Sequence, residues 1–138
     1  MDSTDAHALV ARLLEGFNEG DMVAIERCLH PDVRAELPFA PAAMPAEVGG
    51  REAVMTMFRE GRANFQRMIL TPSQFYWSPD QSTMIMEATS DAELANGVPY
   101  RNRYVFVVRI EAERVILWRE YFNGLIVAEA MAASAATA

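Results

Sequence analysis

Residues 100–123, YRNRYVFVVRIEAERVILWREYFN, constrain the fold more than any other part of the chain. Aromatic and β-branched residues dominate both sides of the polar stretch 111–113, which is the pattern of two strands joined by a tight turn. By the two-residue repeat of a strand, one face of the second arm carries Ile116, Trp118, Glu120 and Phe122. Glu120 is the one charged group on this face, so it is either a solvated edge residue or a functional group in an apolar pocket.

The same repeat divides the first arm into a largely apolar face and a basic face. The first of these faces consists of Tyr100, Asn102, Tyr104, Phe106, Val108 and Ile110. The second face of both arms together carries Arg101, Arg103, Arg109 and Arg119 among Val105, Val107, Val115, Leu117 and Tyr121. An arginine stripe on an acidic protein suggests a paired interface bridged by carboxylates, so we expect a homodimer formed through the outer face of the sheet.

Helical periodicity dominates the N-terminal half. Apolar residues spaced three and four apart predict a helix over 5–19, which Ser3 or Thr4 caps and which Gly20 ends in the left-handed conformation. Asp21 then caps a second helix over 22–29. A short strand over 32–37 and a proline-rich loop follow, and a third helix is predicted over 51–64.

The remainder of the chain has the pattern of strands. Two candidates, over 68–77 and 83–94, precede the long pair, and Asn96-Gly97 marks a hairpin turn. Helices followed by strands indicate an α+β fold, in which three N-terminal helices cover the concave face of a curved, cone-shaped antiparallel sheet. We expect one domain over 1–127 and an Ala-rich, disordered tail over 128–138.

Composition argues against several classes of function. The formal net charge is -7 at pH 7, which disfavours a nucleic-acid partner because phosphate binding needs a basic face. No apolar run approaches the roughly 18–20 residues of a membrane span, and the N-terminus lacks the pattern of an export signal. Cys28 is the one cysteine, and His7 and His30 lack a carboxylate pattern for metal binding, so we expect a cytoplasmic protein without a bound metal.

Three segments resemble the nuclear transport factor 2-like superfamily, in particular its SnoaL-like, ketosteroid isomerase-like branch. They are LLEGFNEGDMVAIERCLHPDV, GGREAVMTMF and the hairpin YRNRYVFVVRIEAERVILWREYFN, and the last is the most specific. The resemblance implies a cone-shaped α+β barrel that usually dimerises through the outer face of its sheet. It implies function less directly, because this scaffold hosts isomerases, cyclases, hydrolases, dehydratases and non-catalytic binders.

Comparison with individual branches of the superfamily leaves one matching residue. Ketosteroid isomerases have their general-base aspartate where this chain has Leu37 and their oxyanion-binding tyrosine at about Leu13, so that residue set is not retained. The W-R-D-Y-F-D segment of limonene epoxide hydrolases aligns its catalytic aspartate with Glu120, but their arginine and second aspartate fall at Glu87 and Thr89. Phenazine-biosynthesis proteins have an acid/base glutamate in a segment similar to the one that contains Glu120.

The resemblance and the strand repeat together predict the lining of a pocket. The residues expected to face it, besides Glu120, are Asn102, Tyr104, Trp118, Phe122, Glu87, Glu36 and Arg34. Burial and mutual repulsion among the three carboxylates would raise at least one of their pKa values, as a general acid/base requires. The alternatives are a structural ion pair for Glu120 and ordinary structural roles for the other charged residues.

We hypothesise a cofactor-independent acid/base enzyme, of isomerase, cyclase, dehydratase or hydrolase type, that acts on a small and largely apolar metabolite. Glu120 would transfer the proton, Asn102 and Tyr104 would orient an oxygen, and Trp118 and Phe122 would form the wall. The alternative is a non-catalytic module of the same fold that binds an apolar compound or serves dimerisation. A wet pocket of roughly 300–1,000 Å³ favours the enzyme, and a dry, packed interior favours the module.

Overall fold

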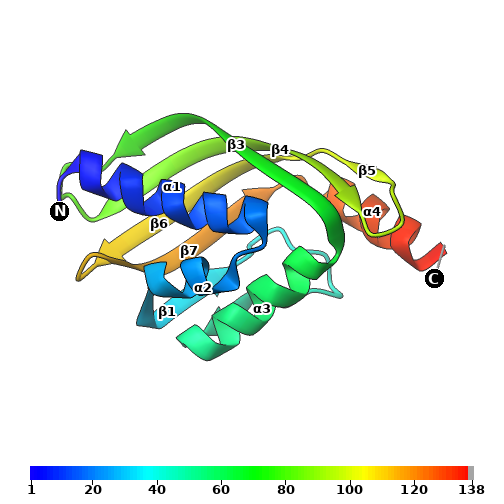
Figure 1. Cartoon of the computed structure of the whole chain (residues 1–138), viewed down its shortest axis with the longest axis horizontal. Helices are drawn as coiled ribbons and strands as arrows, with labels where there is room; N and C mark the ends of the chain where they lie inside the picture. The colour runs from blue at the N-terminus through cyan, green and yellow to red at the C-terminus, as the bar shows by residue number, and fades with distance from the viewer. Residues whose placement is uncertain (137–138) are drawn as a thin grey trace.

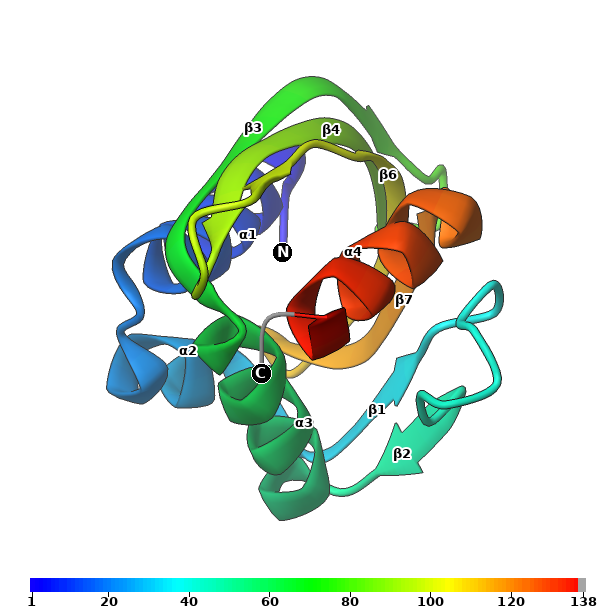
Figure 2. The same ribbon diagram turned by 90° about the vertical axis from the view of Figure 1, so that its right-hand side faces the viewer.

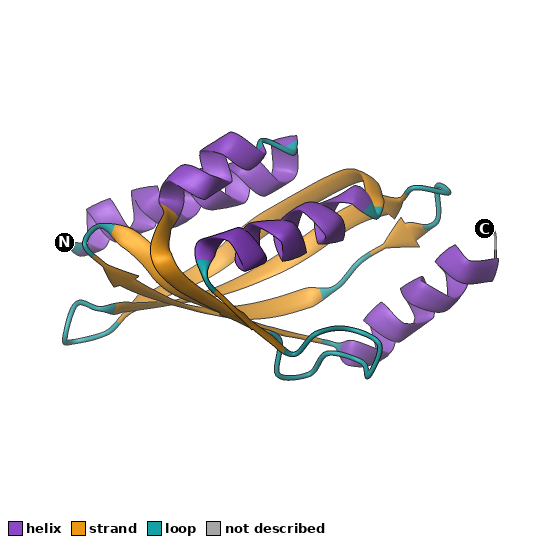
Figure 3. Ribbon diagram, turned by 90° about the horizontal axis from the view of Figure 1, so that it is seen from below, coloured by secondary structure: helices purple, strands orange, loops and turns teal. Residues whose placement is uncertain are grey.

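The computed structural model describes residues 1–136, and in it a curved sheet wraps around three N-terminal helices (Figure 1). In chain order the elements are α1 (Ser3–Glu19), α2 (Met22–Cys28), β1 (Leu29–Glu36), β2 (Glu47–Gly49), α3 (Arg51–Ala63), β3 (Phe65–Trp77), β4 (Thr83–Leu94), β5 (Pro99–Tyr100), β6 (Arg103–Glu111), β7 (Arg114–Phe122) and α4 (Gly124–Ala136). The predicted α+β class is confirmed, with the three helices on the concave side of the sheet (Figure 3).

The sheet is mixed, whereas the sequence predicted an antiparallel one. Its strand order is β2-β1-β7-β6-β4-β3, and β5 pairs with β4. β1 runs parallel to β7 because the long intervening chain, which includes α3, returns the last strand in the same direction. The edge strands β2 and β3 do not pair with each other (Figure 2). The sheet therefore does not close on itself, and the cone is not a complete barrel.

An extra residue in β7 determines which side chains of the last hairpin face inward. Ile110 pairs with Val115 and Arg109 pairs with Leu117, which leaves Ile116 as a bulge. Val115 is fully buried in the core, although simple alternation predicted it for the outer face. After the bulge the phase changes, and Trp118 also points inward. A regular strand could not turn both residues toward the helices.

Several boundaries differ from the prediction. The cap of α1 is Asp2, whose side chain accepts from the backbone N–H of Asp5. β1 begins at Leu29, and β3 begins at Phe65 and tolerates Pro72 because it is an edge strand whose register shifts at that point. Among the described residues, no helix has the length and apolar character needed to cross a membrane.

The C-terminal segment forms a helix where the sequence predicted a disordered tail. α4 crosses the open end of the cone (Figure 2), and its first turn is capped by Asn123, whose Oδ1 accepts from the N–H of Leu125 at 3.0 Å. Its inner side packs on a small core cluster formed by Ala92, Leu94 and Tyr100. Alanine is the strongest helix former, so the low-complexity composition is compatible with a packed helix. Residues 137–138 of the expected tail lie outside the described residues.

The hairpin turn between β6 and β7 uses two residues in an unfavourable conformation. Ala112 and Glu113 have φ angles of 50° and 61°, and a two-residue hairpin turn of type I′ requires positive φ angles at both of its central residues. Asn-Gly adopts these angles at much lower cost. We expect the double variant Ala112→Asn, Glu113→Gly to be more stable by roughly 1 kcal/mol, a rise of a few degrees in Tm measured by calorimetry. An unchanged or lower Tm would contradict this assignment of the turn.

Candidate functional site

A cavity of about 450 Å³ lies between the concave face of the sheet and helices α1, α3 and α4. Its aromatic lining consists of Phe17, Phe58, Phe65, Tyr100, Tyr104, Phe106, Trp118 and Phe122. Its aliphatic and methionine lining includes Leu37, Met44, Met57, Met68, Leu70, Leu94, Val127, Ala130 and Met131. The volume falls within the range of roughly 300–1,000 Å³ that is typical of small-molecule sites.

Glu120 is the acidic residue in this lining. It pairs with Phe106 across the hairpin and shares its face of β7 with Trp118 and Phe122. Its Oε1 accepts a hydrogen bond from the Trp118 indole N–H at 3.2 Å. Within residues 1–136 this is the one hydrogen bond to the carboxylate, and Glu120 has no ion pair there. The second carboxylate oxygen is therefore available to a ligand in the cavity.

The environment of Glu120 favours its neutral form. Burial raises its pKa from 4.5 to about 7, and the hydrogen bond from Trp118 opposes that rise in part. Glu120 is partly exposed and lines the cavity. Near neutral pH both the acid and the carboxylate are populated, so this group can give or take a proton.

Two tyrosine hydroxyls belong to a polar network behind the same wall. Tyr104 donates to Ser90 Oγ at 3.0 Å, and the Tyr100 hydroxyl accepts from Asn102 Nδ2 at 2.9 Å. Burial raises the pKa of both Tyr100 and Tyr104, and the charge of Glu120 adds to each rise. Both phenols therefore remain protonated at neutral pH, and both line the cavity.

Asn102 was predicted to orient a ligand oxygen, but its side chain is fully engaged in structural hydrogen bonds. Its Nδ2 donates to the Tyr100 hydroxyl and to the Asn123 carbonyl, and its Oδ1 accepts from the backbone N–H groups of Arg103 and Asn123. The residue is 3% exposed and lies behind the cavity wall. Its hydrogen bonds hold the segment between β5 and β6 against Asn123, the residue that precedes α4.

Arg34 and Glu36 lie outside the cavity, contrary to the predicted register of β1. Around Arg34 the buried residues of this strand are Val33 and Ala35, so the side chains of Arg34 and Glu36 point to the outer face. Arg34 forms an ion pair with Glu47 on β2. Glu36 accepts from Arg119 Nε at 2.6 Å. Both charges therefore stabilise contacts between strands.

Glu87 also lies on the outer face, where it accepts from the Tyr76 hydroxyl at 2.8 Å. The inward residues of β4 in this stretch are Met86 and Ala88. The alignment with the limonene epoxide hydrolases, which placed Glu87 in the pocket, does not match the register of β4. A slip of one residue reverses the facing of every side chain in a strand. The predicted cluster of three carboxylates does not exist, and the high pKa of Glu120 results from desolvation.

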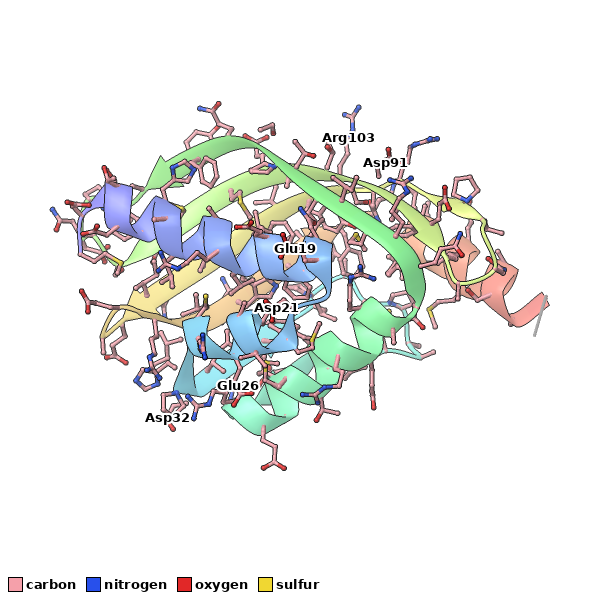
Figure 4. All side chains as sticks on the ribbon, in the orientation of Figure 1. Glu19, Asp21, Glu26, Asp32, Asp91 and Arg103 are labelled. Atoms are coloured by element: carbon pink, nitrogen blue, oxygen red, sulfur yellow. The ribbon has the colours of Figure 1, made fainter. Side chains whose placement is uncertain are left out.

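Other charged residues of the sheet also lie outside. Asp91 and Arg103 project from the convex side, away from the helices (Figure 4). Within the described part of the chain, no group of three or more His, Cys, Asp or Glu residues could hold a metal ion.

Sequence reasoning missed the part of the site that helices provide. Phe17 and Phe58 contribute rings from α1 and α3, with centroids 4.8 Å apart. Arg62 also lines the cavity, but its guanidinium donates to the carbonyls of Phe17, Asn18 and Phe65 at 2.6, 3.3 and 3.0 Å. It therefore braces α3 against α1. The apolar stripes of the helices predicted that these side chains face inward. Such a stripe does not show whether a side chain is packed in the core or lines a cavity.

The raised pKa of Glu120 predicts a pH-dependent stability difference. Ionising this group in the folded state is unfavourable, so its contribution to stability is present below about pH 4.5 and is lost as the pH rises through 7. Glu120→Gln removes this loss. We expect the variant to gain stability over the wild type by up to about 3 kcal/mol between pH 4.5 and pH 8, measured by urea unfolding.

The matched control is Glu87→Gln, which removes a carboxylate from the outer face. Its stability difference from the wild type should change much less over the same pH range. If the gain of Glu120→Gln were the same at both pH values, the desolvation of Glu120 would be disproved.

The comparisons with known proteins agree with this fold. The model of the SnoaL-like domain family matches residues 10–118. The uncharacterized protein YesE of Bacillus subtilis is 30% identical over 100 residues, which are 72% of this chain and 68% of YesE. A Bacillus subtilis crystal structure described as a "Putative Isomerase" superposes with a TM-score of 0.85 and 25% identity, covering 96% of each chain.

A more distant structure was solved with a ligand. RV0760c of Mycobacterium tuberculosis, in complex with estradiol-17beta-hemisuccinate, gives a TM-score of 0.77 at 20% identity, with 86% of this chain and 94% of that chain covered. This likeness shows the shared fold. Together with the match over residues 10–118, the comparisons establish that the chain belongs to the SnoaL-like domain family.

Proposed function

We propose that this protein is a cofactor-independent acid/base enzyme that moves a proton on a small, largely apolar molecule, with Glu120 as the proton-transfer group. The observation that carries the proposal is a lone carboxyl group, with one free oxygen, in the wall of an aromatic cavity. Burial brings its pKa to about 7, where an acid/base catalyst is most effective.

The cavity lining supports an apolar ligand with few polar groups. Aromatic and methionine side chains form most of the surface, and Arg62 is held by backbone carbonyls. Among the described residues that line the cavity, none other than Arg62 is basic, so an anionic group on the ligand would meet Glu120 without a free cation to offset it. A neutral ring compound with one carbonyl or hydroxyl oxygen fits this chemistry best.

Proton transfer at a carbon next to a carbonyl is the reaction that this arrangement favours. The Glu120 carboxylate would take a proton from that carbon, and the electron pair would move to the carbonyl oxygen to form an enolate. The protonated Glu120 would then return a proton to carbon, so the catalyst is regenerated without a cofactor. Tyr100, whose hydroxyl oxygen accepts from Asn102 and whose own proton is not given to Ser90, could donate a hydrogen bond to the oxygen while it carries charge.

The proposal predicts catalysed exchange on a simple ketone. In D₂O near pH 7, the wild type should accelerate the loss of the acidic ring protons of 2-tetralone, followed by ¹H NMR. Glu120→Gln should bind this probe but lose at least about 10²-fold in exchange rate, the usual contribution of a positioned acid/base group. Glu87→Gln, the same substitution on the outer face, should keep the wild-type rate.

Two outcomes would contradict the enzyme. Full exchange activity in Glu120→Gln would remove the proposed role of this residue. Binding of 2-tetralone by the wild type without exchange above the buffer rate would favour the alternative, a ligand-binding module of the same fold.

We also propose that two copies pair through the outer face of the sheet. This face exposes Ile69, Tyr76, Ile85 and Val105 at 38–50%, an apolar surface beside the arginines of β6. Val105→Glu should convert a dimer into a monomer at micromolar concentration, measured by light scattering. Leu125→Glu, at a 75% exposed position on α4, is the control and should leave the mass unchanged. A monomeric wild type would contradict the proposed interface.

A further inference from the structure

We propose that α4 determines the length of the ligand that the pocket admits, through the side chains of Ala130 and Met131. This inference depends on the proposed function only in that the cavity must bind a ligand. It concerns the side of the cavity that the helix closes, whereas the proton chemistry concerns Glu120 on the sheet.

One face of α4 forms part of the cavity wall. Val127, Ala130, Met131 and Ser134 all line the cavity, and their spacing of three and four places them along one side of the helix. The helix lies across the end of the cone that the sheet and the other helices leave open (Figure 2). A ligand held at Glu120 therefore meets this stripe as it extends toward that end.

The position of the stripe is fixed at the start of the helix. Asn102 bonds to both the N–H and the carbonyl of Asn123, at 3.1 and 3.2 Å, and Asn123 caps the first turn. A Cβ on Gly124 would lie 2.8 Å from the carbonyl oxygen of Phe39, so this close approach to the loop after β1 requires glycine.

The far part of α4 is held as well. Asn96, in the turn after β4, donates from Nδ2 to the Ala133 carbonyl at 3.3 Å. Ile126, Val127, Ala130 and Ala133 pack on the cluster of Ala92, Leu94 and Tyr100. With contacts at both ends, the helix acts as a fixed wall, and the size of its inward side chains sets the space available.

Substitutions of Ala130 and Met131 can change the size of the cavity in opposite directions. Ala130 is small and half-buried, so a larger side chain there would project into the cavity. Met131 is long and 38% exposed, so its truncation should enlarge the cavity with little loss of core packing. Ala132 is exposed on the same helix and does not line the cavity, which makes it a matched control.

A series of 4-alkylphenols, from 4-ethylphenol to 4-octylphenol, directly measures the greatest ligand length that the pocket admits. At about pH 8 the phenol remains neutral and can donate to the ionised Glu120, while the alkyl chain extends along the cavity. Each buried CH₂ should raise the affinity about fourfold until the chain reaches α4, where the gain stops. The dissociation constants are measured by isothermal titration calorimetry.

We expect the gain to stop at a shorter chain in Ala130→Leu and at a longer chain in Met131→Ala, with Ala132→Leu matching the wild type. Thermal unfolding of each variant confirms that it is folded. The same limiting length in all four proteins would overturn the role of α4, as would a failure of every alkylphenol to bind. A moved limit combined with affinities that Glu120→Gln leaves unchanged would support α4 as the wall and count against Glu120 as the polar anchor.

Discussion

Desolvation of one carboxyl group is the physical constraint on which this site depends. Glu120 lies among aromatic rings with a single hydrogen-bond donor, the Trp118 indole, and without an ion-pair partner among the described residues. A carboxylate in such a place costs stability when it ionises, and this cost is what brings its pKa close to neutral. The bulge at Ile116 makes the position possible, because it turns Val115 into the core and still leaves Glu120 facing inward.

The surrounding structure keeps the cavity open and its walls in place. Arg62 holds α3 against the end of α1 through backbone carbonyls, so a charged side chain at the cavity serves packing. Asn102 lies between β5 and β6, and its side chain forms hydrogen bonds with the backbone of Asn123, the residue that precedes α4. These polar contacts link the sheet, the N-terminal helices and the C-terminal helix around the cavity that Glu120 lines.

Much of the fold could be predicted from local patterns, whereas the site could be predicted only in part. The stripes of α1 and α3 and the hairpin of β6 and β7 have strong periodicity, so their types were evident from the sequence. The facing of Glu87, Glu36 and Arg34 depended on register, and one residue of slip reverses a strand. The bulge at Ile116 has no local sequence signal, and the packing of α4 depends on distant partners in β4 and β5.

The pH dependence of the chemical shift of the Trp118 indole N–H tests the central claim most directly, because this group donates a hydrogen bond to the Glu120 carboxylate and its signal therefore reports the titration of Glu120. In ¹H–¹⁵N spectra recorded over a pH series, its signal should shift with a midpoint at about 7, and this transition should be absent in Glu120→Gln. Trp77, at the end of β3, serves as the internal control. A midpoint near 4.5, the ordinary value for a glutamate, would show that Glu120 is solvated and would contradict the account.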